Sequence, residues 1–119
     1  MLIPPKALSQ TVLPYGEMRA DYKAGHSFSQ GSLGKKALYI RGVNQFIYSY
    51  VPLNRVQRVY KRLAVSKGFY NGGIFGTLAY LVVRYDGGRE KAFRFKLEDD
   101  VNLLLSDFRK YTKIPVGKE

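Results

Sequence analysis

The residues of this sequence best suited to binding chemistry are cations interleaved with aromatic rings in its central third. Arginine and lysine pair with anionic groups, and exposed aromatic rings stack on nucleic-acid bases, so the combination suits phosphorylated head groups or single-stranded nucleic acid. The set predicted to form a binding surface comprises Arg55, Arg58, Lys61, Arg62, Lys67, Phe69 and Tyr70, with Tyr60 among them. The alternative is a solvated strand face whose charges only discourage pairing with another sheet edge.

Catalytic and metal-binding groups do not converge in the sequence. The chain has no cysteine, which excludes a disulfide framework, a thiolate nucleophile and zinc sites that need sulfur ligands. His26 is the single histidine, and we interpret it as an exposed loop residue because only Asp21 stands near it. Asp99 and Asp100 would point about 100° apart on a helix, so we interpret them as helix-terminus charges. We therefore expect no enzyme activity, no cofactor and no metal site.

The segment Gly68–Gly76 (GFYNGGIFG) contains four glycines and cannot be the interior of a regular element. Its glycines, beside Lys67, could let backbone N–H groups approach a phosphate, but it lacks the Gly-Lys-Ser or Gly-Lys-Thr ending of a P-loop. We interpret it as a hairpin tip. A third hypothesis is that its apolar residues insert into a membrane surface or an interface, namely Phe69, Tyr70, Ile74 and Phe75.

The net charge narrows the class of partner. Twenty Lys and Arg against nine Asp and Glu give a formal charge of +11, which attracts nucleic acid, anionic lipid or acidic proteins. The segment from Lys23 to Lys67 contains no acid, whereas four acids gather near the C-terminus, Glu98, Asp99, Asp100 and Asp107. We expect the positive potential to be one-sided.

The length of 119 residues suits a single domain over 1–119, with enough apolar residues for one core. Pro4 and Pro5 predict an extended N-terminal arm over residues 1–11, and residues 114–119 are predicted to form a short tail. No stretch approaches the ~18 apolar residues of a membrane span, and the first eight residues lack the apolar run of a signal peptide. The expected location is the cytoplasm, with peripheral attachment to a membrane as a further option.

The first half of the chain gives weak signals for secondary structure. Tyr15 to Lys23 is predicted to be a first strand, and the Gly- and Ser-rich stretch Gly25 to Gly34 a loop. Ala37 to Ile40 and Gln45 to Val51 are predicted to form a hairpin that Pro52 ends.

The segment from residue 53 to residue 66 fits two structures. A candidate cap and four apolar residues have helical spacing, Asn54, Val56, Val59, Tyr60 and Leu63. However, valine and tyrosine favour strands, and a bulge would break strict alternation in the same way. The pattern alone leaves both structures open.

The second half is more regular. Leu78 to Tyr85 predicts a strand, and Asp86, Gly87 and Gly88 predict a tight turn with positive φ. The returning strand is predicted to place Phe93, Phe95 and Leu97 on one face and Ala92, Arg94 and Lys96 on the other. The last element is a predicted helix over 98–111, whose apolar stripe consists of Val101, Leu104, Leu105 and Phe108.

Three passages resemble the bacterial members of the pleckstrin-homology-like (PH-like) superfamily. They are ALYIRGVNQFIYSYVPLNRVQRVYKR, AYLVVRYDGGREKAFRFKLEDD and VNLLLSDFRKY, which together span roughly residues 37 to 111. The resemblance implies a mainly β fold, a bent antiparallel barrel of about six to seven strands capped by one C-terminal α-helix at about 98–111. It also implies that Arg55 to Val65 forms a bent strand, which decides the ambiguous segment.

The resemblance further implies a binding platform without chemistry of its own. Members of the superfamily bind phosphoinositides, peptides or partner proteins, and the lipid-binding members use a basic motif between their first two strands. Here that loop would be Gly25 to Lys36 or Arg41 to Asn44, and neither clearly reproduces the motif. No lipid-binding residue is carried over.

Two hypotheses about function follow. The first is a noncatalytic binding or adaptor module whose ligand is an anionic membrane surface or an acidic segment of another protein. The second is a small basic protein that binds single-stranded nucleic acid. A homo-oligomer is compatible with both, because an exposed sheet edge or the segment Gly68–Gly76 could pair protomers.

Overall fold

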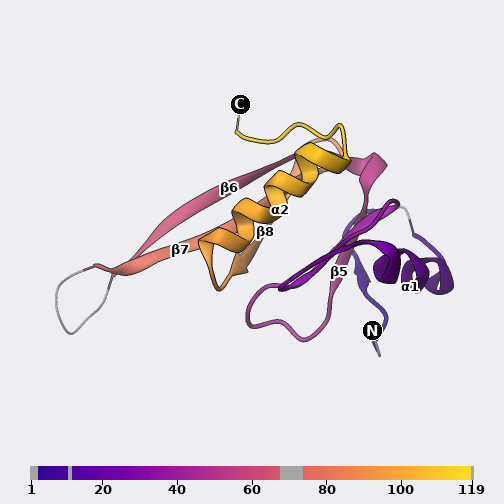
Figure 1. Ribbon diagram of the computed structural model, residues 1–119, viewed down its shortest axis with the longest axis horizontal. Helices are drawn as coiled ribbons and strands as arrows, with labels where there is room; N and C mark the ends of the chain where they lie inside the picture. The colour runs from indigo at the N-terminus through magenta and orange to yellow at the C-terminus, as the bar shows by residue number, and fades with distance from the viewer. Residues whose placement is uncertain (1–2, 11, 68–73, 119) are drawn as a thin grey trace.

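The computed structural model describes residues 3–10, 12–67 and 74–118. In these residues eight strands form two sheets, and two α-helices pack on them, so the fold is mixed α/β (Figure 1). Each described sheet is open, with two edge strands, and the two do not join into a closed barrel. The sequence-based expectation missed one of the helices and the division into two sheets.

The first sheet has five strands in the order β1-β5-β4-β3-β2. Strands β2 to β5 form an antiparallel meander, and β1 joins the edge of β5 in parallel. The strand bounds are Lys6–Ala7 for β1, His26–Phe28 for β2, Gly31–Leu33 for β3, Ala37–Ile40 for β4 and Ser49–Pro52 for β5.

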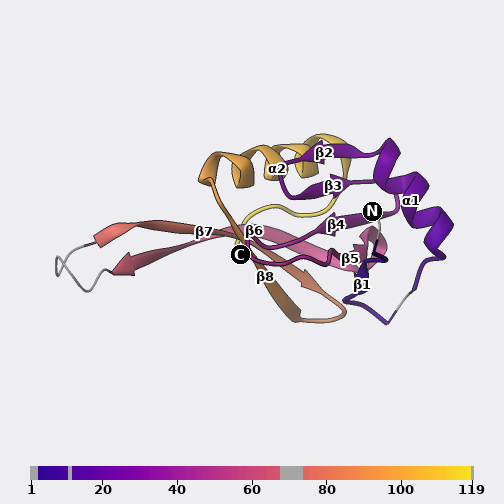
Figure 2. The ribbon, with the colours of Figure 1, turned by 90° about the horizontal axis from the view of Figure 1, so that it is seen from below.

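The second sheet is an antiparallel meander of three strands, with β7 in the middle. Its strands are β6 (Val56–Lys67), β7 (Ile74–Tyr85) and β8 (Arg89–Phe95). Both ribbon views show that the far ends of β6 and β7 project beyond the rest of the chain (Figures 1 and 2). The helix α2 (Glu98–Tyr111) follows this sheet.

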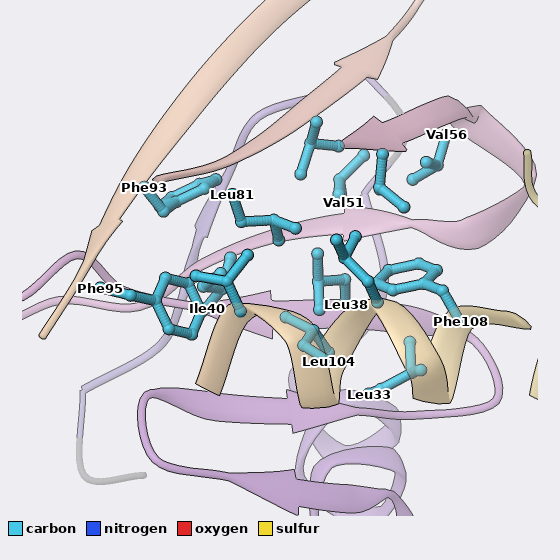
Figure 3. Packing of buried hydrophobic residues seen from close by; sticks show 14 of the residues in the cluster. Leu33, Leu38, Ile40, Val51, Val56, Leu81, Phe93, Phe95, Leu104 and Phe108 are labelled. Carbon is cyan, nitrogen blue, oxygen red and sulfur yellow. The ribbon is translucent and has the colours of Figure 1, made fainter. Parts of the chain in front are cut away.

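The main core lies where both sheets meet α2. Figure 3 shows labelled side chains from the first sheet, from the second sheet and from α2 pointing toward one another. Val101, Leu104, Leu105 and Phe108 are all buried, so the predicted helix and its apolar stripe are confirmed. This burial gives α2 most of its stability, because an isolated helix of this length is marginal in water.

The segment predicted as a first strand is instead the helix α1 (Tyr15–Ala24). Its buried residues Met18 and Asp21 are three apart, the spacing of one helix face. Met18 joins a second apolar cluster with Ala37, Tyr39 and Tyr50 on the side of the first sheet that faces away from the main core. The sequence concealed this helix because half of its buried face is a carboxylate.

The predicted loop Gly25 to Gly34 is also wrong, because most of it is the β2–β3 hairpin. A Cβ added at Gly31 would clash with the backbone carbonyl oxygen of Tyr39. Glycine therefore marks a close approach of β3 to β4, which the sequence pattern cannot distinguish from a loop.

The ambiguous central segment is extended, as the resemblance implied. After a short 3-10 turn at Leu53–Arg55, β6 runs from Val56 with a register shift between Val56 and Arg58. The hairpin before it is confirmed for Ala37–Ile40, but its second strand begins at Ser49 rather than Gln45. Residues 45–48 therefore belong to the β4–β5 connection.

The strand and turn predicted for the second half are confirmed. Asp86, Gly87 and Gly88 all have positive φ, as the tight turn requires. Phe93 and Phe95 are buried, whereas Leu97 is exposed because β8 ends before it and Leu97 is the residue preceding α2. The prediction that Leu97 faces the core was wrong.

Both ends of the described chain are attached to the sheets. Within the predicted N-terminal arm, Lys6–Ala7 pairs with Ser49–Tyr50. In the tail, Val116 forms an isolated parallel bridge with Val59 of β6. No described helix is both long and apolar enough to cross a membrane.

Candidate binding surface

The predicted basic residues on β6 do not share one side of the sheet. Val59 is buried in the main core, and alternate residues of a strand share a face, so Lys61 points toward α2. Arg58 and Arg62 point to the opposite, outer face. The alternation of side chains along β6 therefore places the predicted basic residues on two opposite faces of the sheet, and they do not form one surface.

Several of these cations are paired with groups of the same chain. The Lys61 ammonium lies 2.6 Å from a Glu98 carboxylate oxygen and donates to the side-chain oxygen of Asn102 at 3.0 Å. Arg58 donates to the backbone carbonyl of Gly117 at 2.6 Å. These contacts hold α2 and the tail against β6, so both cations have structural partners.

Arg55 and Arg62 also have neighbours. Arg55 lies 3.9 Å from a carboxylate oxygen of Asp86, and the Arg62 guanidinium lies 5.0 Å from the centre of the Tyr80 ring. The backbone of Lys67 belongs to β6, but Phe69 and Tyr70 lie outside the described residues. The hypotheses about a phosphate cradle or a membrane-inserting tip concern Gly68–Gly76, of which residues 68–73 likewise lie outside the described residues. The prediction that the whole segment is irregular was wrong for its last three residues, because the backbone of Ile74–Gly76 belongs to β7 and pairs with the end of β6.

Tyr60 was expected to supply an exposed ring, but it is only 6% exposed. Its hydroxyl donates to Glu90 at 3.1 Å, and Arg84 donates to the same carboxylate oxygen at 3.1 Å. Burial, followed by the hydrogen bond to Glu90, raises the pKa of Tyr60. A buried, hydrogen-bonded ring cannot act as a stacking surface for a base.

The other candidate groups have structural surroundings. His26 is exposed, as expected, but it lies on β2 and stacks on the Tyr111 ring at a centroid distance of 3.6 Å. In the part of the chain that the structure describes, no three His, Cys, Asp or Glu residues are placed to hold a metal ion. Asp99 and Asp100 lie in the first turn of α2.

The β4–β5 connection presents the most exposed aromatic ring identified in the structure. Phe46 is 91% exposed, and Ile47 and Val43 beside it are also exposed. A bare apolar side chain of this size is unfavourable in water and commonly marks a contact surface when others adjoin it. We call residues 43–47 the apolar loop.

Hydrogen bonds at its base hold the apolar loop in place. The Gln45 side chain accepts from the Gly42 amide at 2.8 Å, and the Gln45 carbonyl accepts from Arg41 at 3.0 Å. The Val43 amide donates to the Arg94 carbonyl on the edge of β8 at 3.0 Å. The exposed side chains are thus carried by an ordered base.

A groove of about 410 Å³ adjoins the apolar loop. Phe46, Ile47 and Leu8 provide its apolar wall, and Lys6 of β1 and Lys91 of β8 add two cations. A polyanion or an anionic surface that docks at this groove would contact both the exposed apolar side chains and the two lysines.

The surrounding charge favours an anionic partner. The sequence has no acidic residue between Asp21 and Asp86. Glu90, the acid next to Lys91, is already bonded to Arg84 and Tyr60, and Asp21 is buried against backbone amides. Because these acids are engaged within the chain, little nearby negative charge opposes the cations of the groove.

The sequence pattern did not reveal this surface. It placed Phe46 in a predicted strand, where alternate side chains would be buried, and Lys6 in a predicted extended N-terminal arm whose docking was left open. The run VNQFI, between a glycine and a tyrosine, was the one signal that could have indicated an exposed apolar loop, because it joins apolar residues to a predicted turn. Lys6 and Lys91 meet there only after β1 and β8 have taken their places.

Comparisons with protein-family models, curated proteins and solved structures found no match to this chain.

Proposed function

We propose that this chain is a noncatalytic binding module of PH-like fold that attaches to anionic membrane surfaces at the cytoplasmic face. The observation that carries the proposal is the nearly complete exposure of Phe46 beside a groove that also contains Lys6 and Lys91. Interfacial binding requires apolar groups that enter the head-group region and cations that attract anionic lipids. The apolar loop and its groove supply both.

The order of elements supports the PH-like assignment. Strands β2 to β5 and β6 to β8 are two antiparallel meanders, and α2 comes directly after them. The resemblance implies about six to seven antiparallel strands followed by one C-terminal helix, and this order of elements agrees with it. The additional helix α1 and strand β1 precede this arrangement and leave it intact.

Vesicle co-sedimentation tests the proposal. The purified chain is mixed with phosphatidylcholine vesicles, with or without phosphatidylserine, at several salt concentrations. We expect binding to the anionic vesicles only, weakening as salt screens the lysines. Phe46→Ser should weaken binding about tenfold or more, because burying a phenylalanine side chain contributes about 1.5–3 kcal/mol.

Matched variants separate the apolar from the electrostatic contribution. Lys6→Gln and Lys91→Gln should each weaken binding about fivefold, since a lysine near an anionic membrane contributes about 1 kcal/mol. Leu103→Ser is the control, because Leu103 is 64% exposed but lies on α2 outside the groove. Equal affinities for Phe46→Ser and Leu103→Ser would refute the assignment of the apolar loop.

Two further ligands complete the experiment. A mixed-sequence single-stranded oligonucleotide tests the nucleic-acid hypothesis, whose signature is a steep loss of affinity with salt. Oligonucleotide binding without vesicle binding would overturn the membrane proposal. Binding to an acidic peptide but to neither of the others would overturn it in favour of a protein partner.

A further inference from the structure

The strand β6 is an edge strand that is covered along only part of its length. It has one neighbour in the second sheet, β7, and its other side faces the tail. The Val59 amide donates to the Pro115 carbonyl at 3.1 Å, and the Val59 carbonyl accepts from the Gly117 amide at 2.8 Å. The tail therefore protects this edge at Val59.

Beyond Val59 the same edge continues without cover. In an antiparallel ladder, every second residue directs both backbone groups away from its partner strand. Because Val59 directs both of its groups to the tail, Lys61, Leu63 and Val65 must direct theirs outward too. Among the described residues, no backbone group bonds to these outward N–H and C=O groups.

The side chains along this open edge are unusually apolar for an exposed strand. Leu63 is 48% exposed and Val65 is 58% exposed, and both lie on the face that carries Lys61. Natural edge strands are commonly protected by charges, proline or a short length. This strand has twelve residues, and the charge at Lys61 is already paired with Glu98.

We propose that β6 pairs with β6 of a second copy of this chain, antiparallel, about a two-fold axis at Leu63. Leu63 then faces Leu63 of the second copy, and Lys61 faces Val65 of the second copy. Each of these pairs exchanges two backbone hydrogen bonds, because the groups involved are the outward ones. The interface joins the two three-stranded sheets into one continuous sheet.

A second copy fits this edge because the edge is complementary to itself. The two-fold register brings the exposed leucines together and places Arg62 opposite Ala64, so that no like charges stand directly opposite each other. The tail limits the pairing to the stretch after Tyr60. Two-fold dimers built from one self-complementary patch are the commonest protein oligomers.

Cysteine cross-linking tests the register directly, since the chain has no cysteine of its own. Directly opposite residues in such a pair have Cα atoms about 5.5 Å apart, within the range of a disulfide. Leu63→Cys should therefore form a covalent dimer under mild oxidation. Leu103→Cys, whose native side chain is also exposed, and Val65→Cys should not.

The double variant Lys61→Cys with Val65→Cys should cross-link efficiently, because residues 61 and 65 face each other in the dimer. Light scattering of the unmodified chain should give the mass of two chains, and Leu63→Lys should give the mass of one. Circular dichroism verifies that Leu63→Lys is folded. Added salt should strengthen the dimer, because it screens the repulsion between two copies of charge +11.

Two results would overturn the proposal. One is a single-chain mass at every concentration together with no more cross-linking of Leu63→Cys than of Leu103→Cys. The other is cross-linking of Val65→Cys as efficient as that of Leu63→Cys, which is incompatible with this register. Vesicle binding is measured separately, so neither result depends on the proposed function.

Discussion

Replacing Asp21 by asparagine tests how α1 is attached to the first sheet. The Asp21 carboxylate is buried and accepts hydrogen bonds from the backbone amides of Lys35, Lys36 and Ala37 and from the Tyr39 hydroxyl. Its oxygens lie 2.9–3.2 Å from these donors. One side chain thus joins α1 to the turn between β3 and β4.

The expected cost of Asp21→Asn follows from these contacts. In the best orientation of the asparagine side chain, its oxygen still accepts hydrogen bonds from Ala37, Tyr39 and Lys36. Its NH₂ group then faces the backbone amide of Lys35, so two donors point at each other. Leaving one donor without an acceptor costs about 1–3 kcal/mol, and the remaining bonds lose the contribution of a charged acceptor. We expect a total loss of about 3 kcal/mol in the free energy of unfolding.

Urea unfolding monitored by circular dichroism measures this loss. With a slope of about 1.5 kcal/mol per molar urea, the midpoint should fall by about 2 M. Asp107→Asn serves as the control, because it removes a carboxylate from α2, away from this cluster. Tyr39→Phe should cost less, since it removes a single donor. If Asp21→Asn and Asp107→Asn shifted the midpoint equally, the attachment of α1 through this carboxylate would be refuted.

Two further predictions concern the first sheet. Gly31→Ala should lower the free energy of unfolding by about 1–3 kcal/mol, because its Cβ would meet the Tyr39 carbonyl. Gly16→Ala in α1, where the space is open, should instead raise the free energy of unfolding by about 0.5–1 kcal/mol. Equal urea midpoints for the two variants would contradict this prediction. Burial, followed by the hydrogen bond to Tyr48, raises the pKa of Tyr22 to about 12. Burial, followed by the hydrogen bond to Asp21, raises the pKa of Tyr39. Because folding favours the protonated phenols, the stability that they contribute is complete below pH 10 and is lost as the pH rises toward 12 and beyond. An absorbance titration of the folded protein at 295 nm should therefore show at least two phases of tyrosine ionisation. A single phase near pH 10 would contradict this prediction.

The elements predicted correctly have complete local signals. The helix α2 has an apolar stripe, acids in its first turn and basic residues in its last turn, all within fourteen residues. The turn Asp86–Gly88 joins two strands of matching periodicity. Nothing distant in the chain is needed to define either element.

The elements missed depend on distant contacts. In α1 the buried carboxylate of Asp21 is stabilised by amides beyond β3, so hydrophobic periodicity could not identify its buried face. In β3 the glycine at position 31 allows the backbone of β4 to approach. Polar burial and close backbone approach both depend on a partner that a local pattern does not contain.

The candidate surface likewise combines properties that the sequence determines with properties that only the tertiary structure decides. The amino-acid sequence alone determined the excess of positive charge, the absence of thiol chemistry and the amphipathic closing helix, because these depend on composition and nearest neighbours. Only the tertiary structure decided that Lys61 is paired, that Tyr60 is buried, and that Phe46 stands exposed beside Lys6 and Lys91. Exposure and charge pairing are set by distances between residues remote in sequence, and those distances exist only once the two sheets and α2 have packed together.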